Sequence, residues 1–184
     1  MFRATFALVV TALALIAAAG MLSLTTSSAS NVHLKGGRNA EPSFTDLGLT
    51  LSASGALAGL GHEDVVITIN ATANPTANCT NPGGQSKVPG QNPAPVDVTG
   101  SVSIPADEVK NGNTPFGVET DPPDTPIPGA PDCPNSSWTE SITDMAFTSA
   151  TIVVEQGGSV VLTISCTFSS PTSDGAVRKA DVNC

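Results

Sequence analysis

The sequence has 184 residues and is poor in aromatic and basic side chains. It contains no tyrosine, one tryptophan and six phenylalanines, and its 7 lysines and arginines are outnumbered by 16 aspartates and glutamates. Proteins that bind nucleic acids need clustered basic side chains to neutralise phosphates, and only Arg178 and Lys179 are adjacent here. The composition therefore excludes a nucleic-acid partner, and the scarcity of aromatic rings argues against a surface that stacks on sugars.

The sequence also lacks the short motifs of common catalytic and metal sites. It has no GxSxG elbow and no CxxC pair, and neither His33 nor His62 lies near a cysteine. Glu119, Asp121 and Asp124 offer carboxylates for calcium within one loop, but their spacing is not that of an EF-hand and two prolines stiffen the loop. We interpret this stretch as a solvated acidic loop, and we predict no metal, cofactor-binding or catalytic residue.

The first thirty residues have the pattern of a secretory signal. Arg3 precedes an unbroken apolar run over residues 6–19, and small residues follow over residues 25–30. This order is typical of a cleavable signal peptide. An uncleaved transmembrane anchor is the alternative, although the run is shorter than the roughly 20 residues that cross a bilayer. We predict a signal helix within residues 1–30, an exported protein, and no stable membrane anchor after cleavage.

All four cysteines, Cys79, Cys133, Cys166 and Cys184, follow the expected signal. An even number of cysteines in an exported chain indicates two disulfide bonds, for which three pairings are possible. We favour Cys79–Cys133, which joins two loops rich in proline and glycine, and Cys166–Cys184, which ties the last residue back to a strand. A free Cys184 that forms an intermolecular bridge is the alternative.

Apolar and polar residues alternate in several short runs, which predicts half-buried strands. The predicted strands cover residues 44–60, 65–72, 96–104, 116–120, 138–142, 145–154 and 159–168, with a β-hairpin turn at residues 155–158. Residues 74–95 and 121–134 are dense in proline, glycine and asparagine and predict irregular loops. Residues 169–184 predict a further loop, with at most a short strand within residues 176–182.

The number of short strands predicts an all-β fold, a single antiparallel β-sandwich that is immunoglobulin-like in general architecture and follows the N-terminal signal helix. A closed barrel is the alternative. The predicted organisation is a signal peptide over residues 1–30, a flexible leader over residues 31–43 and a disulfide-bonded sandwich over residues 44–184.

Acidic residues are the main candidates for catalysis. His62-Glu63-Asp64 could supply a general base, but the trio has the composition of a solvated turn. The paired carboxylates of a glycoside hydrolase meet only in the folded chain, so more residues qualify. The candidates are Glu63, Asp64, Glu119, Asp121 and Glu140.

The loops that carry Cys79 and Cys133 are the least generic stretches of the chain. Asn81-Pro82-Gly83-Gly84-Gln85 and a second Pro-Gly turn at residues 89–93 require a defined backbone path. We consider two interpretations: a rigid ligand-contacting surface at the end of the sandwich, or connections held by a disulfide without a binding role. Trp138, which follows Cys133 closely, is interpreted as a core residue.

These observations predict an exported bacterial β-sandwich without catalytic activity, a binding or structural module at the cell surface or outside the cell. Its partner could be a cell-surface protein, a cell-wall polymer or copies of itself. A small secreted hydrolase that acts through dispersed carboxylates is the alternative. Low lysine with abundant alanine, glycine and proline is typical of GC-rich bacteria, so the glycosylation sequons at Asn70, Asn78 and Asn135 are treated as coincidental.

Overall fold

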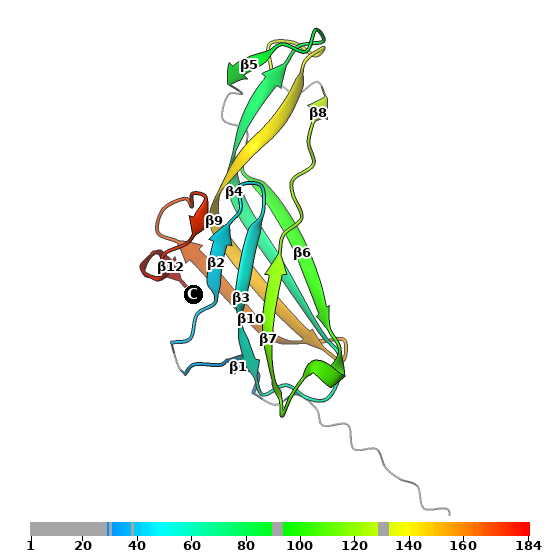
Figure 1. The fold of residues 1–184 in the computed structure, drawn as a ribbon, viewed down its shortest axis with the longest axis vertical. Coiled ribbons are helices and arrows are strands. Elements are labelled where there is room, and N and C mark those ends of the chain that lie inside the picture. The colour runs from blue at the N-terminus through cyan, green and yellow to red at the C-terminus, as the bar shows by residue number, and fades with distance from the viewer. Residues whose placement is uncertain (1–28, 30, 38, 90–93, 129–132) are drawn as a thin grey trace, which may run out of the picture.

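The protein is a two-layer β structure, described by a computed structural model for residues 29, 31–37, 39–89, 94–128 and 133–184, with the backbone only for residues 86–89 and 127–128 (Figure 1). Sheet A contains β1 (His33–Leu34), β2 (Ser43–Asp46), β3 (Leu51–Ala58), β7 (Asn113–Glu119) and β11 (Gly175–Ala176). Sheet B contains β4 (Val65–Thr80), β5 (Ser86–Pro89), β6 (Val96–Ile104), β8 (Ile127–Pro128), β9 (Thr139–Gln156), β10 (Ser159–Phe168) and β12 (Val182–Asn183). The only helical elements in these ranges are two 3₁₀ turns, η1 (Ala106–Glu108) and η2 (Lys179–Asp181). The all-β prediction is thus confirmed, while the predicted signal helix lies outside the described residues.

Both sheets are antiparallel, and each is organised around long central strands. In sheet A, β7 pairs along one edge of β3, β1 and β2 share the other edge, and β11 extends the sheet beyond β2. In sheet B, β9 and β4 lie side by side, with β10 and β12 beyond β9 and β6 beyond β4. Strands β5 and β8 add to the far ends of β4 and β9.

Alternate residues of these strands form the core between the sheets. In β4, Val65, Ile67 and Ile69 are fully buried, whereas the residues between them are more exposed. Phe44 of sheet A meets Phe168 of sheet B edge to face, with ring centroids 5.2 Å apart. Burial of such apolar side chains at alternate positions stabilises the sandwich and sets the register of each strand.

The strand predicted over residues 44–60 is divided by a tight turn. The Asp46 carboxylate accepts a hydrogen bond of 2.9 Å from the Gly48 amide, and Gly48 adopts a φ of +87° that favours glycine. The chain therefore reverses between β2 and β3. Leu47 lies at the turn and is 53% exposed, whereas Leu51 in β3 is fully buried, so alternation alone was a wrong guide here.

Strands β4 and β9 run well past the sandwich and form a projecting two-stranded arm, which is the main departure from the prediction (Figure 1). We define the arm as residues 74–80 and 139–146, which pair with each other beyond the end of β6. The predicted loop at residues 74–80 and the predicted break after residue 142 are both wrong. Pro75 is tolerated because β6 begins opposite Ala73 and β5 ends opposite Asn78, which leaves an open strand edge where no amide donor is needed.

A segment that we call the strap, residues 121–128, runs from β7 along the arm to β8, which pairs with the edge of β9 (Figure 1). At its base the Asp121 amide donates to the Thr99 carbonyl at 2.8 Å. Further along, the Ile142 amide donates to the Thr125 hydroxyl at 3.1 Å, and β8 then pairs with β9 at Glu140 and Thr139. These contacts hold the strap beside the arm.

Each disulfide bond fastens one peripheral segment. Cys79 at the end of the arm is bonded to Cys133, and Cys166 in β10 is bonded to Cys184, which is the pairing favoured by the sequence. The first bridge joins the end of β4 to the loop that precedes β9. The second holds β12 against β10.

The segments on either side of the sandwich are more ordered than predicted. In the leader, His33 and Leu34 pair with β3, and Val32 is buried, because this apolar side chain reaches the core between the sheets. In the C-terminal tail, β11 pairs with β2 of sheet A and β12 pairs with β10 of sheet B. The tail therefore connects the two sheets along one side.

Candidate functional site

The end of the arm carries the two loops that stand out in the sequence. We define the tip as residues 81–85 and 133–138. The backbone of Asn81 and Gln85 closes the first loop, because Asn81 donates to the Gln85 carbonyl at 3.2 Å and Gln85 donates to the Asn81 side chain at 2.9 Å. The second loop is a compact turn in which the Ser137 amide donates to the Asn135 side chain at 3.0 Å. Both loops are thus internally bonded, and they lie at the end of the arm instead of at the end of the sandwich.

The Cys79–Cys133 bridge joins these two loops, and Trp138 packs against it. Cys79 is fully buried and Cys133 is 8% exposed, whereas Pro82, Gly84, Asn135 and the other residues at the turns are exposed. Trp138 was predicted to be a core residue of the sandwich. Its indole instead packs against the disulfide at the end of the arm, outside the main core. The tip is therefore a rigid, solvent-facing surface with a small apolar centre.

The tip is uncharged, in contrast to the rest of the protein. Residues 81–85 and 133–138 contain no Asp, Glu, Lys or Arg, while the whole chain has a formal net charge of -9. From Ala73, opposite the start of β6, to Thr80 the arm advances roughly 25 Å at about 3.4 Å per residue. The Debye length at physiological salt is only about 8 Å, so the field of the acidic sandwich is largely screened at the tip.

The carboxylates that were candidates for hydrolysis lie in three regions of the structure. Glu63 and Asp64 lie in a turn at the opposite end of the sandwich from the arm, and Glu140 lies within the arm. Glu140 lies sixteen positions along β9 from Gln156, which contacts that turn, and this separation corresponds to roughly 50 Å of strand. Glu119, at the end of β7, accepts a hydrogen bond of 2.6 Å from the Thr50 hydroxyl, and Asp121 begins the strap.

The trio His62-Glu63-Asp64 forms a turn that other residues fasten in place. Buried Gln156 accepts a 2.7 Å hydrogen bond from the Gly61 amide and donates to the Glu63 carbonyl at 2.8 Å. The Asp64 carboxylate accepts the Ala106 amide at 2.8 Å. These contacts fix the backbone and leave His62 exposed, so they explain the turn without a catalytic base.

Two of the three acidic residues considered for calcium lie in one pocket. Asp121 and Asp124 line a shallow pocket of about 310 Å³ with Asp97, and the Asp97 carboxylate accepts the Thr72 hydroxyl at 2.6 Å. Within the described ranges, no group of three or more His, Cys, Asp or Glu side chains could hold a metal ion.

A buried carboxyl group that sequence reasoning missed is Asp46. It is 2% exposed and accepts hydrogen bonds from the Gly48 amide and the Thr172 hydroxyl, and Thr172 in turn accepts the Phe147 amide at 2.8 Å. Burial raises the pKa of Asp46, these hydrogen bonds lower it, and the nearby carboxylates of Asp144 and Asp174 raise it further, with a net upward shift. The network links β2, β9 and the C-terminal tail. The sequence signal was an aspartate two residues before a glycine, which is typical of an Asx turn.

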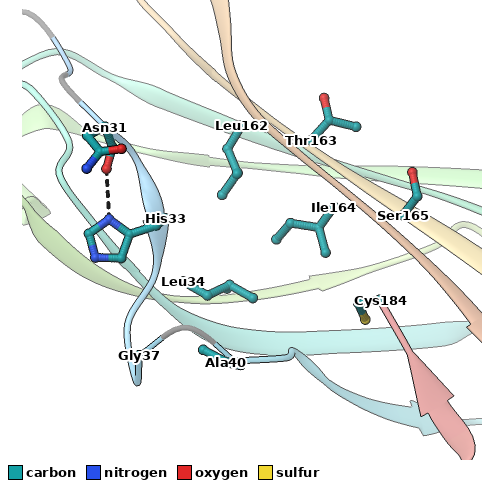
Figure 2. Close-up of a pocket in the computed structure, with 10 residues that line it drawn as sticks. All are labelled: Asn31, His33, Leu34, Gly37, Ala40, Leu162, Thr163, Ile164, Ser165 and Cys184. Carbon is teal, nitrogen blue, oxygen red and sulfur yellow. Dashed lines mark hydrogen bonds between the residues drawn. The ribbon is translucent and has the colours of Figure 1, made fainter.

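A groove of about 800 Å³ lies between β10 and the segment that contains β1 (Figure 2). Leu34, Leu162 and Ile164 give the groove an apolar lining. Strand β12 pairs with β10 only at Thr167 and Phe168, so it does not extend along β10 as far as Leu162 and Ile164. His33, whose ring nitrogen donates to the Asn31 carbonyl at 2.7 Å, is the one titratable side chain among the described lining residues apart from the disulfide-bonded Cys184.

Comparisons with known proteins give no information on function, so a function has to be inferred from the geometry of the structure. No protein-family model, curated protein or solved structure matches the chain. In the described part of the chain, no helix is long and apolar enough to cross a membrane. The two disulfides indicate an oxidising, non-cytoplasmic compartment.

Proposed function

We propose that the chain is an exported, non-enzymatic binding module of immunoglobulin-like architecture that presents the tip of its arm to a partner outside the cell. The signal-like residues 1–30 and the two disulfides support export. The sandwich serves as the scaffold, and the arm holds the tip away from it. Binding residues are commonly found on loops that a rigid scaffold positions.

The observation that carries this proposal is the contrast between an uncharged, disulfide-stapled tip and an acidic body. Most of the core of the sandwich lies outside the arm, although Ala77, Ile142 and Met145 of the arm extend that core. Cys79, Cys133 and Trp138 form a separate small cluster at the tip. The exposed amide and hydroxyl groups of Gln85, Asn135 and Ser136 offer donors and acceptors without a net charge. Such a surface suits a neutral region of a cell-surface protein or cell-wall polymer.

Binding to isolated cell envelopes of the producing organism tests this proposal. We expect the exported wild-type protein to sediment with the envelopes, and the bound fraction to change little between about 0.05 and 0.5 M salt, because no ion pair at the tip is screened. Ser136→Asp places a carboxylate on the tip and should weaken binding at least about tenfold, since a buried unpaired charge costs well over 1.4 kcal/mol.

Ser159→Asp is the matched control, because Ser159 is an exposed serine at the opposite end of β9 and β10. It should bind like wild type. Equal binding by Ser136→Asp and wild type would refute the role of the tip. Release of sugars from the envelopes by the wild-type protein would instead favour the alternative, a secreted hydrolase.

A further inference from the structure

We propose that the Cys79–Cys133 disulfide controls the strap: when the bridge is reduced the strap leaves the arm, and the arm opens while the sandwich stays folded. A dithiol reductant supplies two electrons and two protons, which convert the bridge to two thiols, and the reductant is itself oxidised to a disulfide. The structure supports this through the few contacts that hold the strap, the residues beside it and the boundary of the arm.

Few contacts with the described residues hold the strap apart from the bridge. Three sets of hydrogen bonds join the strap to the described parts of sheet B. They are the Asp121–Thr99 bond at its base, the Thr125–Ile142 bond midway and the two-residue pairing of β8 with β9. Side chains of the strap are described for residues 121–126, and among these only Pro123 is buried. A two-residue strand pairing is marginal by itself. The covalent link at Cys133 therefore keeps these weak contacts together.

The residues beside the strap lose cover when it leaves. Ile142 is 5% exposed and lines a pocket of about 310 Å³ with Pro122 and Pro123 of the strap. Burial of such an apolar side chain stabilises the arm. Without the strap the arm is a pair of strands alone, which is marginally stable in water. Release of the strap therefore favours the open arm.

The arm has a clear boundary with the sandwich. The Met145 amide donates to the Gly48 carbonyl at 2.9 Å, which attaches β9 to the turn of sheet A where the arm begins. Below this point β4 and β9 are flanked by β6 and β10, and most of the main core lies there. Opening beyond Met145 removes Ala77 and Ile142 from the main core and leaves its larger part covered, as expected for a local unfolding unit.

Hydrogen exchange followed by mass spectrometry tests this inference in the oxidised full-length exported protein and in Cys79→Ser/Cys133→Ser. In the variant, amides of residues 76–80 and 139–144 should exchange at least about 100-fold faster than in wild type, while amides of residues 65–71 and 150–156 remain protected. Cys166→Ser/Cys184→Ser is the matched control, in which exchange should increase around residues 165–184 and the arm should stay protected.

Trp138 fluorescence gives a second measurement, because the indole packs on the bridge. Its emission should shift to longer wavelength in the Cys79→Ser/Cys133→Ser variant or on reduction of wild type, with the β-sheet circular dichroism retained. Continued protection of the arm, or loss of protection from arm and sandwich together, overturns the inference. The consequence for binding rests on the proposed function: the open arm should bind envelopes less. Failure of the oxidised wild type to bind would count against that function alone.

Discussion

Replacing Asp46 with asparagine should change how the stability of the protein depends on pH. Asp46 is buried, and its pKa in the folded protein lies above the unfolded value of 3.8, first because of desolvation. A raised pKa means that the folded state binds a proton more tightly than the unfolded state. The resulting stability is fully present below about pH 3.8 and is lost as the pH rises through the folded pKa. Asparagine does not ionise and removes this loss.

The expected magnitude combines two terms. The asparagine oxygen still accepts the Gly48 amide, but the Thr172 hydroxyl loses the carboxyl oxygen that accepts its hydrogen bond, which costs about 1 kcal/mol. At a pH where Asp46 is ionised in both the folded and the unfolded wild type, the wild type loses stability that the variant keeps. This loss is about 1.4 kcal/mol for each unit by which the folded pKa exceeds the unfolded one. Asp46→Asn should therefore be less stable than wild type near pH 3, and should approach or exceed it near pH 7.

Urea unfolding followed by circular dichroism at several pH values measures this difference. In thermal unfolding, 1 kcal/mol corresponds to about 2–4 °C for a chain of this size. Asp174→Asn is the control, because Asp174 is exposed and only contributes repulsion to Asp46, so its effect should have the same direction and be smaller. Parallel pH profiles for wild type and Asp46→Asn would refute the reasoning, as would a wild type that gains stability over the variant with rising pH.

Two further predictions concern packing and the arm. A methyl group added at Gly100 would overlap the Glu119 carbonyl oxygen and crowd the Thr120 backbone, whereas one added at Gly117 would meet nothing within 4 Å. In denaturant unfolding, Gly100→Ala should lose about 3 kcal/mol or more and Gly117→Ala less than about 1 kcal/mol, and equal losses would contradict this packing. Cys79→Ser and Cys133→Ser should each lower stability by similar amounts, up to about 4 kcal/mol for a loop with a sequence separation of 54, and the double variant should be little worse. Additive losses in the same assay would show that the bridge is not what stabilises the fold.

Local patterns were sufficient to predict the sandwich, because its strands are half buried. The alternation of Val65, Ile67 and Ile69 with polar residues reports directly on which face meets the core. The hairpin between β9 and β10 was equally visible, since Gly157 and Gly158 supply the positive φ angles that its turn needs.

The arm could not be predicted in this way, because its residues imitate a loop. Asn74 and Pro75 are typical of turns, but β4 passes through them as a strand since β9 continues alongside. Its buried face is made by Ala77, Cys79 and Ile142 beside a strap that is distant in sequence. Long-range pairing therefore overrode local propensity. Asp46 was hidden for a related reason, because its burial depends on Thr172 and the C-terminal tail.

Because β4 and β9 are single strands shared by the arm and the sandwich, mechanical load on the tip has a defined path. Tension applied at Thr80 and Thr139 runs lengthwise down both strands into the middle of sheet B. The hydrogen bonds to β6 and β10 lie across that direction, so the load shears many of them at once instead of separating them one after another. Within the described residues β4 and β9 share the longest pairing, so a partner that pulled on the tip would load these two strands first.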